Sequence, residues 1–495
     1  MSLRDQLARL LFPAIRWDSE LGFEPARPGI ERALELGVGG FIFFGGSAPA
    51  VAELITELRA RSRHPVLIGA DLERGAGQQF TGLTPLPPLA AIGALDDLEI
   101  TRRAGELTAR EAVGLGIDWV YAPVADLDIE PDNPIVGTRS FGSDPDRVAD
   151  QVVAWIEGCR AGGALASVKH FPGHGRTTND SHITLPIVEA SAAELEQDLI
   201  PFRAAIRAGV ESVMTAHISF PALDPSGAPA TLSPRIITGL LRSELGFDGL
   251  VVTDALIMSG VRGAGPGSSP EVAAIAAGCD ILLYPQDPEG VLAALDTALE
   301  ESLPESRVAE ALARLDHYLS GRVTHDGGGL LSTPSPESPT SWAEGVGVRT
   351  IGFGRGSELP AWWSDLERIT LVTIDDDLGG PYPPPARTTL SQRLREGGLE
   401  VAELGIGEPI GSNPSNLVIA IYADIRGWKG RPGLSEGART ELANLLEAEP
   451  EALLLLFGHP RLIGELPDAG GAVITGWGGE HLMQGAMANW LLRAD

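Results

Sequence analysis

The densest group of chemically useful side chains lies in the segment KHFPGHG, which begins at Lys169 and is followed by RTTN and then Asp180-Ser181-His182. Its glycines and prolines are unfavourable in a helix, so we expect a long loop. Asp180 and His182 are two residues apart, and in an extended segment their side chains point to the same side. The carboxylate can then accept the imidazole N–H, which fixes the tautomer and raises the basicity of the other nitrogen. This pair predicts a proton donor and acceptor that works near neutral pH.

The same loop allows a second interpretation, a zinc site built from His170, His174 and His182. Zinc accepts imidazole ligands in a tetrahedral arrangement. Neither strand pairing nor i, i+4 helical spacing orients these three rings in advance. The spacing therefore favours proton transfer over metal binding.

Ionisable side chains also follow five successive predicted strands, at the point where each strand ends. They are Asp71, Asp126, Lys169 with His170, His217 and Asp254. In a barrel of parallel strands these ends meet at one rim, where the chemistry of such barrels takes place. Asp254 is then a candidate nucleophile opposite His182, and two groups flanking one scissile bond are the arrangement of glycoside hydrolysis. Sugar hydroxyls need partners of mixed charge, which are available from Asp71, Arg139, Lys169 and His170.

The elements that position these residues follow a repeating pattern. Short apolar segments rich in β-branched and aromatic residues lie at residues 13–17, 40–44, 66–70, 118–121, 166–170, 212–217, 250–253 and 280–284. Helix-like segments separate them, and one of these, at residues 190–208, predicts a single helix. Eight strand-helix repeats predict an α/β fold in the form of a closed (β/α)8 TIM barrel.

The chain divides into three predicted parts. Residues 1–320 form the TIM-barrel domain, and residues 321–345, rich in Gly, Ser, Pro and Thr, form a linker. Residues 346–495 again alternate apolar strands, at 369–374, 417–422, 452–457 and 472–475, with helical segments. This part predicts a smaller αβα sandwich domain, for which the sequence offers no functional motif.

Composition excludes several classes of protein. The chain of 495 residues is 43% hydrophobic and carries a net charge of -30, from 37 Lys and Arg against 67 Asp and Glu. Such a field repels nucleic acid and anionic membrane surfaces, so we expect neither as a partner. Two cysteines, Cys159 and Cys279, cannot build a disulfide framework. No signal peptide is visible, so we expect a cytoplasmic protein; its oligomeric state is left open.

Several longer motifs resemble one known family. KHFPGHG with DSH, GFDGLVVTDAL, APVADL and GTRSFGSDP are together similar to the β-N-acetylglucosaminidases of glycoside hydrolase family 3. The resemblance covers the whole barrel. It implies a (β/α)8 barrel with an additional αβα domain, and retaining hydrolysis of terminal β-linked N-acetylglucosamine without a metal or organic cofactor.

The resemblance also implies roles for single residues. Asp254 forms the glycosyl-enzyme, and His182 is the acid/base assisted by Asp180. The family's sugar-binding positions correspond to Asp71, Arg139, Lys169 and His170, and we add Asp126 and His217 from the same rim. The implied substrates are cell-wall fragments, either muropeptides or chito-oligosaccharides, and the implied role is peptidoglycan recycling. One departure is Gln79, which stands where relatives have an arginine, so the outer part of the site loses a charge.

Three alternatives remain at this point. Asp126-Leu127-Asp128-Ile129-Glu130 matches the end of the substrate-assisted chitinase motif, which would make Glu130 the acid and the substrate acetamide the nucleophile. Phosphorolysis is the second, because an imidazole leaves the site less negative than a carboxylate would and phosphate could replace water. The third is a sugar-binding module without activity, which measurable turnover would exclude.

Overall fold

The computed structural model describes residues 2–261, 269–320, 337–364, 366–377, 384–405, 416–425, 427, 429–468 and 471–493. Its residues form two compact units, which are described separately. The first unit comprises Met1–Thr84, Leu98–Ile129 and Ser143–Pro336. The second comprises Pro85–Asp97, Glu130–Gly142 and Glu337–Asp495. Two segments from within the range 1–320 therefore pack with the second unit.

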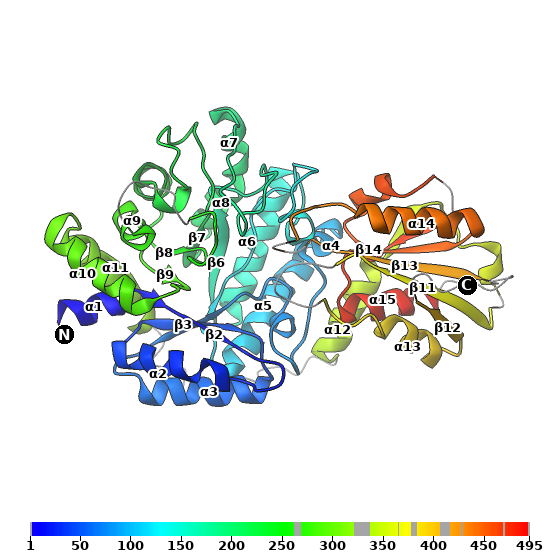
Figure 1. Cartoon of the computed structure of the whole chain (residues 1–495), viewed down its shortest axis with the longest axis horizontal. Helices are drawn as coiled ribbons and strands as arrows, with labels where there is room; N and C mark the ends of the chain where they lie inside the picture. The colour runs from blue at the N-terminus through cyan, green and yellow to red at the C-terminus, as the bar shows by residue number, and fades with distance from the viewer. Residues whose placement is uncertain are drawn as a thin grey trace. The chain divides into compact units, whose positions relative to one another are not determined.

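The first unit contains the predicted parallel barrel (Figure 1). Its strands are β1 (Leu11–Phe12), β2 (Ala14–Arg16), β3 (Gly40–Phe44), β4 (Leu67–Ala70), β5 (Trp119–Val120), β6 (Leu165–Phe171), β7 (Ser212–Thr215), β8 (Leu250–Thr253) and β9 (Leu282–Leu283). Strands β2 to β8 pair in chain order, all in parallel. A parallel bridge from Val252 to Ile281 leads to β9, and β9 pairs with β1. Because β1 and β2 are one run interrupted at Pro13, this pairing closes the barrel.

The helices of the first unit cover this sheet. They are α1 (Leu3–Ala8), α2 (Arg27–Leu36), α3 (Ala48–Arg61), α5 (Leu98–Leu115), α6 (Pro145–Ala161), α7 (Ala192–Asp198), α8 (Ile200–Arg207), the π-helix η5 (Arg235–Glu244), α9 (Pro270–Ala277), α10 (Pro288–Glu301) and α11 (Glu305–Ser320). Helices α5 and α6 approach closely at glycines, since a Cβ on Gly158 would lie 1.8 Å from the carbonyl oxygen of Arg102. The single helix expected at residues 190–208 is two helices, because Pro201 has no N–H and begins a new helix at its first turn.

The second unit is an αβα sandwich. Its strands are β10 (Gly352–Arg355), β11 (Arg368–Asp375), β12 (Glu400–Leu404), β13 (Leu417–Ala423), β14 (Leu453–Gly458) and β15 (Val473–Thr475). They lie in the order β10-β15-β14-β13-β11-β12, and only the β10 pairing with β15 is antiparallel among these strands. Its helices are α4 (Leu89–Ala94), α12 (Pro339–Thr350), α13 (Thr389–Glu396), α14 (Glu436–Ala448) and α15 (His481–Leu491). Helix α12 begins inside the expected linker at 321–345, of which residues 321–336 lie outside the described residues.

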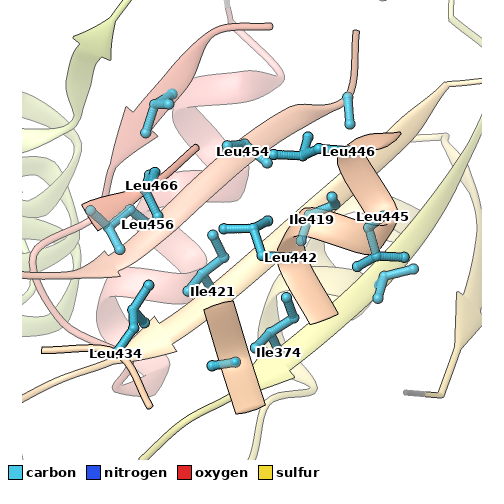
Figure 2. Packing of buried hydrophobic residues seen from close by; sticks show 14 of the residues in the cluster. Ile374, Ile419, Ile421, Leu434, Leu442, Leu445, Leu446, Leu454, Leu456 and Leu466 are labelled. Carbon is cyan, nitrogen blue, oxygen red and sulfur yellow. The ribbon is translucent and has the colours of Figure 1, made fainter. Parts of the chain in front are cut away.

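The sheet of the second unit is covered on both faces. Figure 1 shows α14 on one side of this sheet and α13 and α15 on the other. Figure 2 shows Leu442 and Leu445 of α14 against Ile419, Ile421 and Leu454 of the central strands, all of them buried. Burial of apolar side chains at about 25 cal/mol per Å² makes such a core the main source of stability.

Asp280 provides a test of what holds the barrel closed at its amino-terminal face. Its carboxylate is fully buried, accepts the Val251 N–H at 2.9 Å and pairs with Arg242 at 2.6 Å, Arg314 at 3.2 Å and Arg307. An Asp280→Ala substitution leaves these guanidinium groups without their shared anion, so we expect it to lower the free energy of unfolding by about 3–5 kcal/mol.

Urea unfolding followed by circular dichroism measures this change. The control is Asp296→Ala at the partly exposed pair of Asp296 with Arg4, where we expect less than about 1 kcal/mol. Equal effects of the two substitutions would contradict the structural role of Asp280.

None of the described helices combines the length and the apolar character that a bilayer crossing demands.

Candidate active site

Lys169 lies at the carboxyl end of β6 between two carboxylates. Its Nζ is 2.7 Å from Asp71 Oδ1 and 2.7 Å from Glu73 Oε1. Lys169 and Glu73 are buried, whereas the Asp71 side chain is 27% exposed and can reach a ligand. Sequence reasoning missed Glu73, although its position two residues after Asp71 is the spacing that places two side chains on one side of an extended segment. The three groups form a fixed polar cluster, in which two carboxylates share one ammonium group.

Asp126 fixes the orientation of His170. One carboxylate oxygen, Oδ2, is 2.7 Å from His170 Nδ1, and the other, Oδ1, accepts the backbone N–H of His170 at 3.1 Å and of His174 at 2.7 Å. Burial opposes the ionisation of Asp126, but His170 and the hydrogen bonds it receives lower the pKa of this carboxyl below its usual value. Asp126 therefore fixes the backbone of the loop at His170 and His174 and orients the His170 ring.

Asp180 and His182 form the predicted hydrogen bond, with a local geometry that differs from our expectation. Asp180 Oδ1 is 2.7 Å from His182 Nδ1 and also accepts the backbone N–H of His182 at 2.9 Å. The segment is a turn and not extended. The Asp180 carboxylate accepts the backbone N–H of the residue two positions later, which is the hydrogen bond of an Asx turn. Asp180 is buried and the His182 side chain is 19% exposed. The imidazole is thus held by its Nδ1 atom.

Asp254 follows β8 directly and is surrounded by imidazoles. Burial alone would raise the pKa of Asp254, but the nearby His170, His217 and His182, with the backbone N–H of Ala255, lower it to about 2. His217 is buried, with Nδ1 2.8 Å from Thr231 Oγ1 and Nε2 3.3 Å from the Ala255 carbonyl oxygen. Burial lowers the pKa of His217. Three imidazoles therefore interact electrostatically with one carboxylate, two from the predicted rim, His170 and His217, and one from the loop, His182.

Two predicted residues lie in the second unit, on the segment Glu130–Gly142. Arg139 ends the short 3-10 helix η3 (Gly137–Arg139) and donates to the Ile135 carbonyl oxygen at 3.1 Å. Glu130, the acid of the chitinase-like alternative, accepts the backbone N–H of Asp132 at 3.0 Å. Within this unit Thr138 Oγ1 donates to Asp424 Oδ1 at 2.9 Å, which ties the segment to the end of β13.

The side chains of Gln79 and His174 both make hydrogen bonds to other groups of the protein. The side-chain oxygen of Gln79 accepts the Gly45 N–H at 3.1 Å, so its amide supports the loop after β3. Both ring nitrogens of His174 contact hydroxyl groups, Nδ1 to Thr177 at 2.7 Å and Nε2 to Ser181 at 2.9 Å. The zinc interpretation therefore lacks its arrangement of ligands, and among the described residues no group of three His, Cys, Asp or Glu side chains is placed to hold a metal ion.

The sequence of the barrel matches a known family of enzymes. The model of the glycosyl hydrolase family 3 N-terminal domain matches residues 2–317. The chain belongs to glycoside hydrolase family 3. Membership agrees with the site described above, in which a partly buried, ionised carboxylate and an oriented imidazole share one rim of a barrel.

Relatives within the family carry related names. A protein of Chromobacterium violaceum named β-hexosaminidase is 37% identical over 292 residues, which are 56% of this chain and 80% of that protein. A Cellulomonas fimi protein named β-N-acetylglucosaminidase/β-glucosidase is 36% identical over 292 residues, 57% of this chain. The match covers 52% of the Cellulomonas fimi protein, so the chain spans about half the length of that relative.

Two solved structures match the chain over both units. A glycoside hydrolase family 3 β-N-acetylglucosaminidase from Paenibacillus sp. str. FPU-7 has a TM-score of 0.85 at 29% identity, covering 99% of this chain and 97% of that one. A β-glucoside phosphorylase has a TM-score of 0.83 at 25% identity, covering 100% and 92%. The predicted combination of barrel and αβα domain is therefore that of known family 3 structures.

Proposed function

We propose that this family 3 enzyme is a retaining β-N-acetylglucosaminidase that hydrolyses terminal β-linked N-acetylglucosamine. The observation that carries the proposal is the ionised Asp254 beside an imidazole, His182, that is oriented by Asp180. Relatives named β-hexosaminidase and a similar structure named β-N-acetylglucosaminidase support the substrate class. A retaining glycosidase needs one nucleophile and one group that serves in turn as acid and base.

In the first step an oxygen of Asp254 attacks the anomeric carbon, and the bond from that carbon to the leaving oxygen breaks. His182, protonated on Nε2, transfers this proton to the leaving oxygen, so the aglycone departs as an alcohol. In the second step His182 Nε2 removes a proton from water, whose oxygen attacks the same carbon and releases Asp254. Asp180 holds Nδ1 throughout and stabilises the charge on the ring each time it is protonated.

The remaining rim residues are assigned to sugar binding. We assign the hydroxyl groups of the terminal sugar to Asp71, Lys169, His170 and Arg139, with Asp126 acting through His170. His217 borders the nucleophile, and its lowered pKa keeps it neutral at pH 7, so it adds a hydrogen-bonding group without a further charge. Fragments of peptidoglycan are the proposed natural substrates, and recycling in the cytoplasm is the proposed role.

The low pKa of Asp254 predicts how activity depends on pH. A carboxyl with a pKa of about 2 stays ionised, and so nucleophilic, as the pH falls from 7 to about 3, whereas an ordinary Asp is half protonated near 3.9. For 2,4-dinitrophenyl β-N-acetylglucosaminide, whose leaving group needs no proton, kcat/KM should therefore show no acid-side inflection near pH 4. Samples returned to pH 7 control for acid unfolding. A reversible inflection at pH 4 or above would contradict the assignment.

Phosphorolysis is a second candidate function, favoured by the imidazole acid/base. A carboxylate in that position would repel phosphate, whereas a neutral His182 does not repel it and a protonated His182 attracts it. A structure similar to this chain is named β-glucoside phosphorylase. In this reaction the phosphate oxygen replaces water in the second step and the product is a sugar 1-phosphate.

One experiment tests both candidates. Release of 4-nitrophenol is measured from the β-N-acetylglucosaminide and the β-glucoside, each with and without phosphate. Turnover of the acetamido sugar that is indifferent to phosphate supports the proposal. A strict requirement for phosphate would identify the enzyme as a phosphorylase. Turnover of the glucoside alone would overturn the proposed substrate class.

A further inference from the structure

His174 connects two parts of the site that the mechanism does not itself link. Its backbone N–H donates to Asp126 Oδ1, the carboxylate that also holds His170. The residue is 3% exposed, and its ring lies between the hydroxyl groups of Thr177 and Ser181. Ser181 is the residue between Asp180 and His182. A chain of contacts thus runs from the sugar-binding end of β6 to the acid/base pair.

The hydrogen-bonding pattern assigns a direction to each contact. The Thr177 hydroxyl donates to the His174 carbonyl oxygen at 3.1 Å, so its oxygen accepts the proton on His174 Nδ1. In this tautomer Nε2 has a lone pair and accepts the Ser181 hydroxyl proton at 2.9 Å. A neutral imidazole therefore satisfies both contacts, and Ser181 is held by a side chain that is itself fixed by Thr177.

Ser181 is also held by a backbone hydrogen bond from the loop that follows Asp254. Its carbonyl oxygen accepts the Gly260 N–H at 3.1 Å, and the His182 carbonyl oxygen accepts the Ser259 N–H at 3.4 Å. The approach is close, since a Cβ on Gly260 would lie 2.9 Å from the Ser181 carbonyl oxygen. The nucleophile loop and the acid/base turn therefore meet at Ser181, where a side chain and a backbone contact fix one residue.

We propose that His174 is a positioning residue for acid catalysis, which sets the place of His182 by holding the Ser181 hydroxyl. The inference rests on the function proposed above. Without the His174 contact the turn keeps its Asx geometry and its backbone hydrogen bonds to Ser259 and Gly260, but it loses its side-chain hydrogen bond to the preceding loop. A misplacement of about 1 Å at a catalytic group can cost on the order of 10²-fold in rate. Loss of the His174 contact should therefore impair protonation of the leaving group while leaving the nucleophile intact.

The test uses His174→Phe, Ser181→Ala and the double variant, with phenyl and 2,4-dinitrophenyl β-N-acetylglucosaminides as substrates. Phenol leaves only with protonation, whereas dinitrophenol leaves without it. We expect His174→Phe to lower kcat/KM about tenfold for the phenyl substrate and less than about threefold for the dinitrophenyl substrate, as for one lost hydrogen bond. The double variant should lose no more than the worse single variant, because both remove the same contact.

Two results would overturn the proposal. Equal losses on both substrates would show that His174 supports only the fold, and additive losses in the double variant would show that it does not act through Ser181. The matched control is His64→Phe, which removes an imidazole contact to the Gly37 carbonyl oxygen before β4, and it should leave both rates unchanged. If His174→Phe does not fold, Ser181→Ala alone must give the same leaving-group dependence.

A second readout separates this inference from the proposed function. Hydrogen exchange of the peptide spanning residues 177–184 should be faster in His174→Phe than in wild type, whatever the substrate. Wild-type protein that releases neither phenol overturns the proposed function. In that case hydrogen exchange alone tests whether His174 fixes the turn. Unchanged exchange in His174→Phe would overturn this inference.

Discussion

Asp254→Asn is expected to lower kcat for N-acetylglucosaminides by about 10⁴ to 10⁶, the range found when one member of a catalytic triad is removed. The amide has the same shape but lacks the charge needed to attack the anomeric carbon. In the wild type this charge is secured by His170, His217 and His182, which lower the pKa of Asp254 to about 2. The loss should be the same for phenyl and dinitrophenyl substrates, because no leaving group compensates for a missing nucleophile.

Steady-state release of the phenol measures this loss. The matched control is Asp248→Asn, which replaces a 92% exposed carboxylate just before β8, at the opposite end of the strand that Asp254 follows. It should keep wild-type activity. Turnover of Asp254→Asn within about tenfold of wild type, together with loss of activity in Glu130→Gln, would instead support the substrate-assisted mechanism.

The barrel was predictable because its parallel strands are covered on both sides and read as continuous apolar runs. Each of the eight predicted runs contains or overlaps a strand, and the strand ends differ by one or two residues in most cases. The prediction of the second unit was less complete. Its edge strands β10 and β12 were missed, since β10 has glycines at 352 and 354 and β12 alternates with exposed polar residues.

The candidate site was predictable where spacing along one strand or turn decides the geometry. Asp180 and His182 are such a case, and the structure has the hydrogen bond between them, although in a turn. The partners of Lys169 and Asp126 could not be derived in the same way, because they depend on which loops meet at the rim. His174 shows this limit, since its partner Ser181 is seven residues away in a loop without regular structure.

Arg139 marks a different limit. Chain position places it in the long connection between β5 and α6, yet its segment packs with the second unit through Thr138 and Asp424. A sequence pattern reports local periodicity and cannot report which of two domains a long connection joins. The assignment of Arg139 to sugar binding therefore stays a proposal drawn from the family resemblance.

His182→Ala is the second substitution with a large expected effect. In the proposed mechanism it removes the proton donor of the first step and the base of the second, and general acid/base groups contribute about 10² to 10⁴ in rate. With a disaccharide or phenyl leaving group we expect kcat/KM to fall by that factor. With 2,4-dinitrophenol the first step needs no proton, so kcat/KM should fall far less while kcat falls, because the glycosyl-enzyme now waits for water without a base.

This divergence between substrates distinguishes an acid/base from a residue that only supports the fold. Asp180→Asn should show the same pattern at smaller size, since the imidazole remains but its Nδ1 loses the carboxylate that orients it. His317→Ala, at an exposed position on α11, is the control and should alter neither rate. Equal losses on both leaving groups in His182→Ala would assign the proton to another residue, and His217, whose ring contacts the Ala255 carbonyl oxygen next to Asp254, would be the first to examine.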